Sequence, residues 1–147
     1  MPFLCIHECT NLGKEVIISV IREENEQMFR EEAYMCTQSQ LNIVLKKISE
    51  IYKSVYGEKL VRVILYGSYA RGDFSDDSDL DIVALVHGDR MKLQEQLKNV
   101  WDQTCDLELE YEMVLSPAVI PYEEFEKYRE DLPYYRNIAN EGVNVVA

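Results

Sequence analysis

Two short, mostly apolar runs constrain the fold of this chain most, because each is typical of a strand buried in a sheet. The first run, Leu60–Tyr66, is rich in β-branched residues, and the second covers residues 79–86. A polar segment that contains glycine, residues 67–78, joins them. The sequence therefore predicts two strands connected by a polar loop.

Helices are predicted on either side of these strands. Apolar residues repeat at helical spacing before the first strand, at Leu41, Val44, Leu45, Ile48, Ile51, Tyr52 and Val55. Thr37 and Gln40 have the spacing of a capping box at the start of this helix, and Gly57 is expected to end it. A second helix is predicted over residues 89–104, with Trp101 in the core.

The segment 107–115 alternates strictly between apolar and acidic residues, which predicts a third strand. The apolar set is Leu107, Leu109, Tyr111 and Met113, and the acidic set is Glu108, Glu110 and Glu112. Two short helices are predicted after it, at about 122–130 and 133–140, because Pro121 and Pro133 each stand where a helix can begin. A tail strand is expected at 143–146.

At 147 residues the chain has the length of one domain. The recognisable pattern begins after residue 34, so we expect a domain over 35–147 and an N-terminal appendage over 1–34, either helical or partly disordered. No apolar run approaches the roughly 20 residues that cross a bilayer. A cytoplasmic location is expected on that basis.

The charge of the chain limits its partners. Fifteen Lys and Arg stand against twenty-seven Asp and Glu, which gives a formal net charge of −12. A protein that grips nucleic acid through phosphates needs a basic face, and this composition disfavours a large one. A protein or a cationic small molecule suits the charge better than bulk DNA or RNA.

The chemistry is expected where the two central strands meet the polar loop. Gly67 lets the backbone come close to a phosphate, and Ser68 follows it with a hydroxyl and the start of a short helix. Asp79 and Asp81 are two residues apart on a strand, so their carboxylates point from one face. Paired carboxylates repel each other unless a cation such as Mg²⁺ lies between or beside them. The pattern predicts Mg²⁺, most simply two ions, at a triphosphate.

A third carboxylate is expected from a neighbouring strand, as metal ligand or general base. Glu108, Glu110 and Glu112 all lie on one face of the predicted 107–115 strand, and the alternation does not choose among them. Arg71 has two interpretations: it can clamp a phosphate, or it can bond Asp73 and the turn.

These residues resemble the signature of the polymerase-β-type nucleotidyltransferase superfamily: Gly-Ser, ten residues, then Asp-Leu-Asp at 79–81. The sequence Gly-Ser-Tyr-Ala-Arg-Gly followed by Ser-Asp-Leu-Asp resembles that of the minimal branch of this superfamily, the MNT-type antitoxins that accompany HEPN-domain toxins. The similarity continues through 109–116 and 133–143, so that it covers roughly residues 37–146. It implies an α+β fold with a mixed β-sheet flanked by helices.

The resemblance also implies roles. Asp79 and Asp81 would bind the metal, Gly67 and Ser68 the triphosphate, and Glu112 would be the third carboxylate, where the family more often has Asp. The implied reaction is transfer of AMP from ATP to a tyrosine hydroxyl of a separate HEPN toxin. Two alternatives remain open: a module that neutralises its partner by contact alone, and a nucleotidyltransferase that modifies a small cationic molecule, as aminoglycoside nucleotidyltransferases do.

Overall fold

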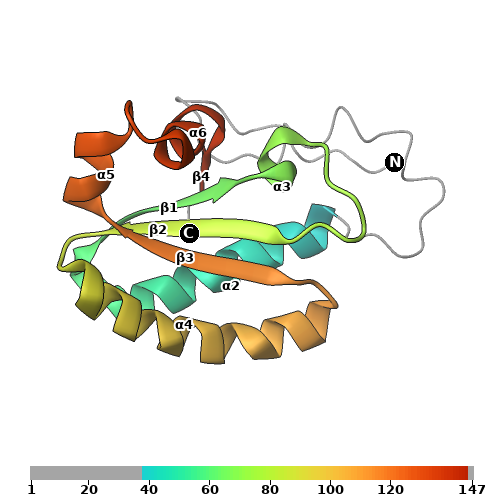
Figure 1. Cartoon of the computed structure of the whole chain (residues 1–147). Coiled ribbons are helices and arrows are strands. Elements are labelled where there is room, and N and C mark those ends of the chain that lie inside the picture. The colour runs from blue at the N-terminus through green and yellow to red at the C-terminus, as the bar shows by residue number, and fades with distance from the viewer. Residues whose placement is uncertain (1–37, 146–147) are drawn as a thin grey trace.

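Residues 38–145, which the computed structural model describes, form a β-sheet with helices on both faces (Figure 1). In chain order the elements are α2 (Gln38–Tyr56), η3 (Gly57–Lys59), β1 (Leu60–Tyr66), α3 (Ser68–Arg71), β2 (Leu80–Val86), α4 (Arg90–Tyr111), β3 (Leu115–Pro121), α5 (Tyr122–Tyr128), α6 (Pro133–Glu141) and β4 (Val143–Asn144). The strand order is β3-β2-β1-β4. β1 pairs antiparallel with β2 and β4, whereas β2 and β3 are parallel. The predicted α+β fold with a mixed sheet is confirmed.

The predicted N-terminal appendage, residues 1–34, and the predicted cap at Thr37 lie outside the described residues. Within 38–145, none of the helices combines the length and the apolar character that crossing a membrane requires.

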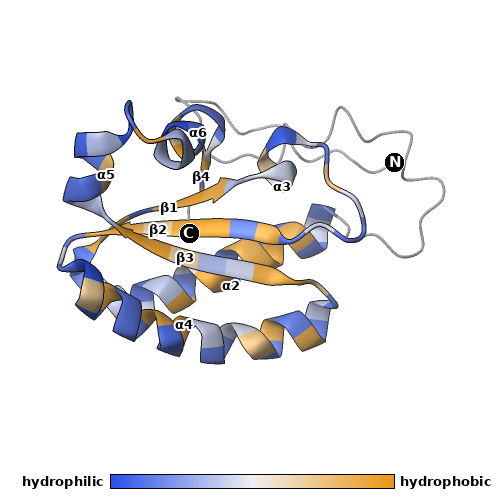
Figure 2. Cartoon of the chain, in the orientation of Figure 1, coloured by the Kyte–Doolittle hydropathy of each residue, from blue (hydrophilic) through white to orange (hydrophobic). Residues whose placement is uncertain are grey.

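The sheet separates two apolar clusters. The larger one lies under α2 and α4 and includes Ile82 and Ala84 of β2, while the smaller one lies under α5 and α6 and includes Val83 and Leu85 (Figure 1). Because both faces of β2 are covered, this strand is apolar along nearly its whole length, as Figure 2 shows. The predicted strands at 60–66 and 79–86 therefore hold, with β2 beginning one residue later.

The predicted strand at 107–115 is wrong. α4 continues through Tyr111, and the third strand is β3, residues 115–121. The buried residues of α4 are Leu93, Leu97, Val100, Thr104 and Leu107, a helical spacing that extends into the predicted strand. Leu109, which the alternation placed beside Leu107, is 81% exposed. The alternation was therefore fortuitous, and the helical period decides the structure.

β3 is an edge strand, and α4 covers its outer side. The indole Nε1 of Trp101 donates to the carbonyl oxygen of Pro117 (3.1 Å), and Gln94 Nε2 donates to that of Val119 (3.2 Å). The amide of Leu115 donates to Oε1 of Glu108 (2.8 Å). Trp101 is therefore 51% exposed at this edge, and the prediction that it lies in the core is wrong.

Tyr52 connects α2 to the sheet through its hydroxyl group, although its ring is fully buried. The hydroxyl accepts from the amide of Ala118 (3.0 Å) and lies 2.8 Å from the carbonyl oxygen of the same residue, to which it donates. The same hydroxyl lies 3.3 Å from the carbonyl oxygen of Ile82 in β2, so Tyr52 contacts both β2 and β3.

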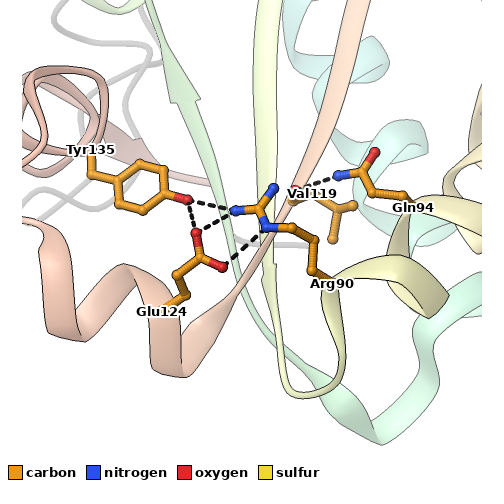
Figure 3. Close-up of polar contacts among 5 residues, drawn as sticks. All are labelled: Arg90, Gln94, Val119, Glu124 and Tyr135. Carbon is orange, nitrogen blue, oxygen red and sulfur yellow. Dashed lines mark hydrogen bonds and ion pairs between the residues drawn. The ribbon is translucent and has the colours of Figure 1, made fainter.

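A polar network holds α5 and α6 at the opposite end of the sheet (Figure 3). Arg90, the first residue of α4, donates through Nε to Glu124 of α5 (3.1 Å) and through Nη2 to the hydroxyl of Tyr135 of α6 (2.7 Å). The Tyr135 hydroxyl also donates to Glu124 (2.5 Å). Three helices are thus joined by one set of charged and polar contacts.

Candidate active site

The turn after β1 brings the backbone against β2. Gly67 has φ 76° and ψ −155°, and a Cβ at this position would lie 2.3 Å from Oδ2 of Asp81. Only glycine satisfies both the backbone conformation and this close approach. The carbonyl oxygen of Gly67 then accepts from the amides of Ala70 (3.1 Å) and Arg71 (3.0 Å), which starts the short helix α3 at Ser68.

Asp79 and Asp81 lie together beside this turn. Asp79 is exposed and immediately precedes β2, and Asp81 is half-buried within β2. The pKa of Asp81 is raised, chiefly because burial disfavours its charged form and also because of the negative charge of Asp79, while Arg71 partly opposes the shift. The structure therefore brings together Gly67, Asp79 and Asp81, as their spacing predicted.

The donors at this position fit a hard divalent cation. A half-buried carboxylate whose pKa is raised by burial and by the charge of Asp79 gains from a neighbouring positive charge, and Mg²⁺ is commonly held by one or two carboxylates together with substrate phosphates. Gly67 and Ser68, which follow β1, offer a backbone without a Cβ and a hydroxyl next to Asp81. The metal and triphosphate roles predicted for these four residues remain predictions.

Glu112 does not complete a three-carboxylate centre. It is the C-cap of α4 in a left-handed conformation (φ 52°), exposed, with its amide bonded to the Glu108 carbonyl oxygen. Among residues 38–145, no three His, Cys, Asp or Glu side chains gather where they could hold a metal ion. The strand that was to present Glu112 does not exist, so its predicted place beside the aspartates is wrong.

The two alternatives to Glu112 are engaged elsewhere. Glu108 accepts from the Leu115 amide at the edge of the sheet, and Glu110 pairs with Lys47 of α2 (3.4 Å). Both glutamates belong to α4, whose residues 104 and 107 face the core. Neither glutamate therefore joins the aspartates.

Ser116 is the residue that β3 places next to the aspartates. It pairs with Asp81 in the parallel register, and its hydroxyl lies 3.5 Å from Oδ2 of Asp79. The sequence prediction missed Ser116 because it assigned residues 107–115 to the third strand. Following the helical spacing from Leu93 to Leu107 would have moved the strand forward and revealed this residue.

Arg71 is bound by acidic side chains. Its Nε donates to Asp73 (3.2 Å) and its Nη1 to Glu141 of α6 (3.2 Å). Of the two interpretations of Arg71, these contacts agree with the one in which it bonds Asp73. They also connect the turn to α6. Its effect on the pKa of Asp81 shows that its charge still acts on the site.

Aromatic residues border the turn. Tyr69 of α3 is buried and stacks on Phe74 (ring centroids 4.3 Å apart). Tyr66, which pairs with Asp81 across β1 and β2, has its hydroxyl 2.9 Å from that of Tyr134. Both Tyr66 and Tyr69 therefore make packing contacts on either side of the Gly67 turn.

An open groove of about 410 Å³ adjoins the aspartates on the β3 side. It passes from the sheet face around the edge strand to α4, and it is lined by Tyr66, Trp101, Thr104, Cys105, Glu108, Leu115, Ser116, Pro117 and Ala118. The groove therefore extends from Tyr66, at the end of β1, to Ser116 on the β3 side of the aspartates.

Known proteins are similar to most of the described chain. The family model described as nucleotidyltransferase domain matches residues 45–144. Two proteins of Methanocaldococcus jannaschii, each with protein adenylyltransferase as a predicted activity, are similar in sequence. The first is 34% identical over 98 residues, covering 67% of this chain and 90% of that protein. The second is 32% identical over 76 residues, covering 52% and 75%.

Two solved structures are more distantly similar. A mutant of the toxin–antitoxin pair MntA–HpeT has a TM-score of 0.44 at 15% identity, covering 68% of this chain and 70% of that one. A nucleotidyltransferase of Sulfolobus solfataricus has a TM-score of 0.42 at 21% identity, covering 78% and 88%. Both TM-scores are low, so the assignment rests on the sequence matches. The family model matches residues 45–144, and the chain covers 90% of the first M. jannaschii relative. This chain is therefore a member of the nucleotidyltransferase-domain family of enzymes.

Proposed function

We propose that this chain is a Mg²⁺-dependent protein adenylyltransferase that moves AMP from ATP to a hydroxyl group of a partner protein. The observation that carries the proposal is the contact between the Gly67 turn and Asp81, with Asp79 next to it. In the proposed function this turn would bind the phosphates and the two aspartates would bind the cation. The predicted activity of the two M. jannaschii relatives supports a protein as the acceptor. With ATP as donor, the proposed location is the cytoplasm.

In the proposed reaction the acceptor oxygen forms a bond to the α-phosphorus of ATP. The bond from that phosphorus to the bridging oxygen breaks, and pyrophosphate leaves with the electron pair, while the acceptor proton passes to solvent. Bound Mg²⁺ would supply charge neutralisation for the phosphates and the leaving group. Asp79 and Asp81 would hold the cation, and Gly67 and Ser68 would position the triphosphate.

The proposed acceptor is a tyrosine of a HEPN-domain toxin encoded as a separate polypeptide. The sequence similarity to MNT-type antitoxins, which is greatest around the Gly67 turn and Asp79–Asp81, supports this choice. The net charge of −12 also favours a partner with a basic surface, because complementary charge accelerates association and orients the complex.

The test is transfer itself. The chain is mixed with ATP, Mg²⁺ and the HEPN protein encoded nearest to it, and intact mass spectrometry follows the addition of AMP to the partner. Asp79→Asn and Asp81→Asn should each abolish the addition. Asp76→Asn, a change of the same type in the exposed loop, is the matched control and should transfer normally. Normal transfer by both Asp79→Asn and Asp81→Asn would refute the proposed site.

The absence of a third carboxylate favours a second candidate function. Within residues 38–145 the aspartates have no acidic third partner, so the domain could silence the toxin by contact with little transfer. An Asp79→Asn/Asp81→Asn double variant that neutralises the toxin at the same dose as the native chain would support this candidate. Loss of neutralisation, with the complex still formed, would favour the enzyme.

A further inference from the structure

Three side chains form a row across the sheet at the candidate site. The register pairs Tyr66 of β1 with Asp81 of β2, and Asp81 with Ser116 of β3. Paired residues on adjacent strands project from the same face. Ser116 is half-buried, and its hydroxyl is 3.5 Å from Oδ2 of Asp79, so it is adjacent to both aspartates.

The position of Ser116 is the one from which a third acidic ligand would act. It lies on the β3 side of Asp81, whereas the Gly67 turn that would hold the triphosphate follows β1 on the other side. β3 itself, with the sequence Leu-Ser-Pro-Ala-Val-Ile-Pro, contains no acidic residue that could replace it. In this row, therefore, the site has a neutral hydroxyl in place of a negative charge.

We propose that Ser116 limits this centre to one tightly bound divalent cation, the one that accompanies the triphosphate, and leaves the acceptor-side cation weakly bound. This inference rests on the proposed function. Two adjacent divalent ions repel each other, and each ion is held more weakly as fewer negative side chains are present to offset that repulsion. A serine hydroxyl adds a weak oxygen ligand and no charge, so the second ion gains little from it.

The inference has a consequence for the reaction. Without a tightly held cation or a carboxylate beside the acceptor, its hydroxyl is activated poorly, and transfer is slow relative to nucleotide binding. A negative charge at position 116 should strengthen the second cation site without altering the first.

Counting bound Mn²⁺ tests the inference without measuring activity. Mn²⁺ substitutes for Mg²⁺ at carboxylate sites and is detected by electron paramagnetic resonance. The native chain, loaded with one equivalent of α,β-methylene ATP, should bind one Mn²⁺ tightly. Ser116→Asp should bind two, the second on the order of tenfold tighter than in the native chain, because ligand charge sets cation affinity. Leu109→Asp, which adds the same charge at an exposed position of α4, should still bind one.

The outcomes separate the inference from the proposed function. Two tightly bound ions in the native chain, or no second ion in folded Ser116→Asp, would overturn the inference and leave the adenylyltransferase proposal intact. A native chain that binds neither the nucleotide analogue nor Mn²⁺ would overturn both. If Ser116→Asp does not fold, the count in the native chain still decides, and Ser116→Glu provides a second acidic variant.

Discussion

Replacing Gly67 with alanine should damage the site far more than the fold. The added Cβ would lie 2.3 Å from Oδ2 of Asp81, so that this oxygen must retreat by about 0.7 Å to reach even 3.0 Å, a separation that real Cβ atoms almost never undercut. The backbone conformation, φ 76° and ψ −155°, is essentially restricted to glycine and adds about 1–3 kcal/mol of strain. A displacement near 1 Å in a catalytic group can lower the rate about 10²-fold.

Gly72 supplies the matched control. It also has a positive φ, 86°, but a Cβ there would meet no atom within 4 Å. Gly72→Ala should lower the free energy of unfolding by about 1 kcal/mol, because alanine is strained in a left-handed conformation. The affinity of this variant for the cation should be unchanged. Gly67→Ala should lose nucleotide-dependent Mn²⁺ binding and about 10²-fold in AMP transfer.

The assays are urea unfolding, for the free energy of unfolding, and Mn²⁺ binding with α,β-methylene ATP present. If Gly67→Ala matched Gly72→Ala in both measurements, the close approach to Asp81 would not matter for the site. The proposal that the Gly67 turn and the two aspartates form one binding site would then be refuted.

Three further predictions concern stability. Tyr52→Phe should lower the free energy of unfolding by about 1–3 kcal/mol, because the partly buried Ala118 amide loses its acceptor; a change within error would contradict the contact. The hydrogen bonds that Glu124 accepts, chiefly from Arg90 and then from Tyr135, lower its pKa. The ionised Glu124 therefore stabilises the folded chain above the ordinary pKa of 4.5, and this stabilisation is lost as the pH falls through the pKa of the folded state. Glu124→Gln should remove this part of the acid sensitivity in urea unfolding, and an unchanged pH profile would refute it. The pKa of Asp81 is raised, so its ionised form destabilises the cation-free chain above the ordinary value of 3.8. Asp81→Asn should therefore raise the urea midpoint near neutral pH but not below that value, and no gain near neutral pH would contradict the shift.

The central strands and the paired aspartates could be predicted because their signals are local. Apolar β-branched runs mark β1 and β2, and the distance from Gly67 to Asp81 is set by one loop between adjacent strands. The third strand could not be predicted in the same way. Residues 107–113 fit both a strand and a helix over a short window, and only the preceding turns of α4 resolve the choice.

The true third strand also has a poor strand signal, because it contains Pro117 and Pro121. Proline is unfavourable inside a sheet but tolerated at its edge, and the edge position of β3 depends on the order of strands, which the local pattern does not reveal. Because of this error, the sequence analysis chose Glu112, rather than Ser116, as the third residue beside the aspartates. The exposure of Trp101 could not be predicted either, because its indole nitrogen donates to the carbonyl oxygen of Pro117 at the edge of β3.

The covered edge of β3 restricts how another polypeptide can approach the site. A free strand edge invites a foreign chain to add itself through main-chain pairing, which is a common route to aggregation and to peptide capture. Here Pro117 has no amide to offer, and side chains of α4 already occupy the neighbouring carbonyl groups and the Leu115 amide. The acceptor protein of the proposed reaction would therefore be recognised at this edge by its side chains and shape, and it could be released once it has been modified.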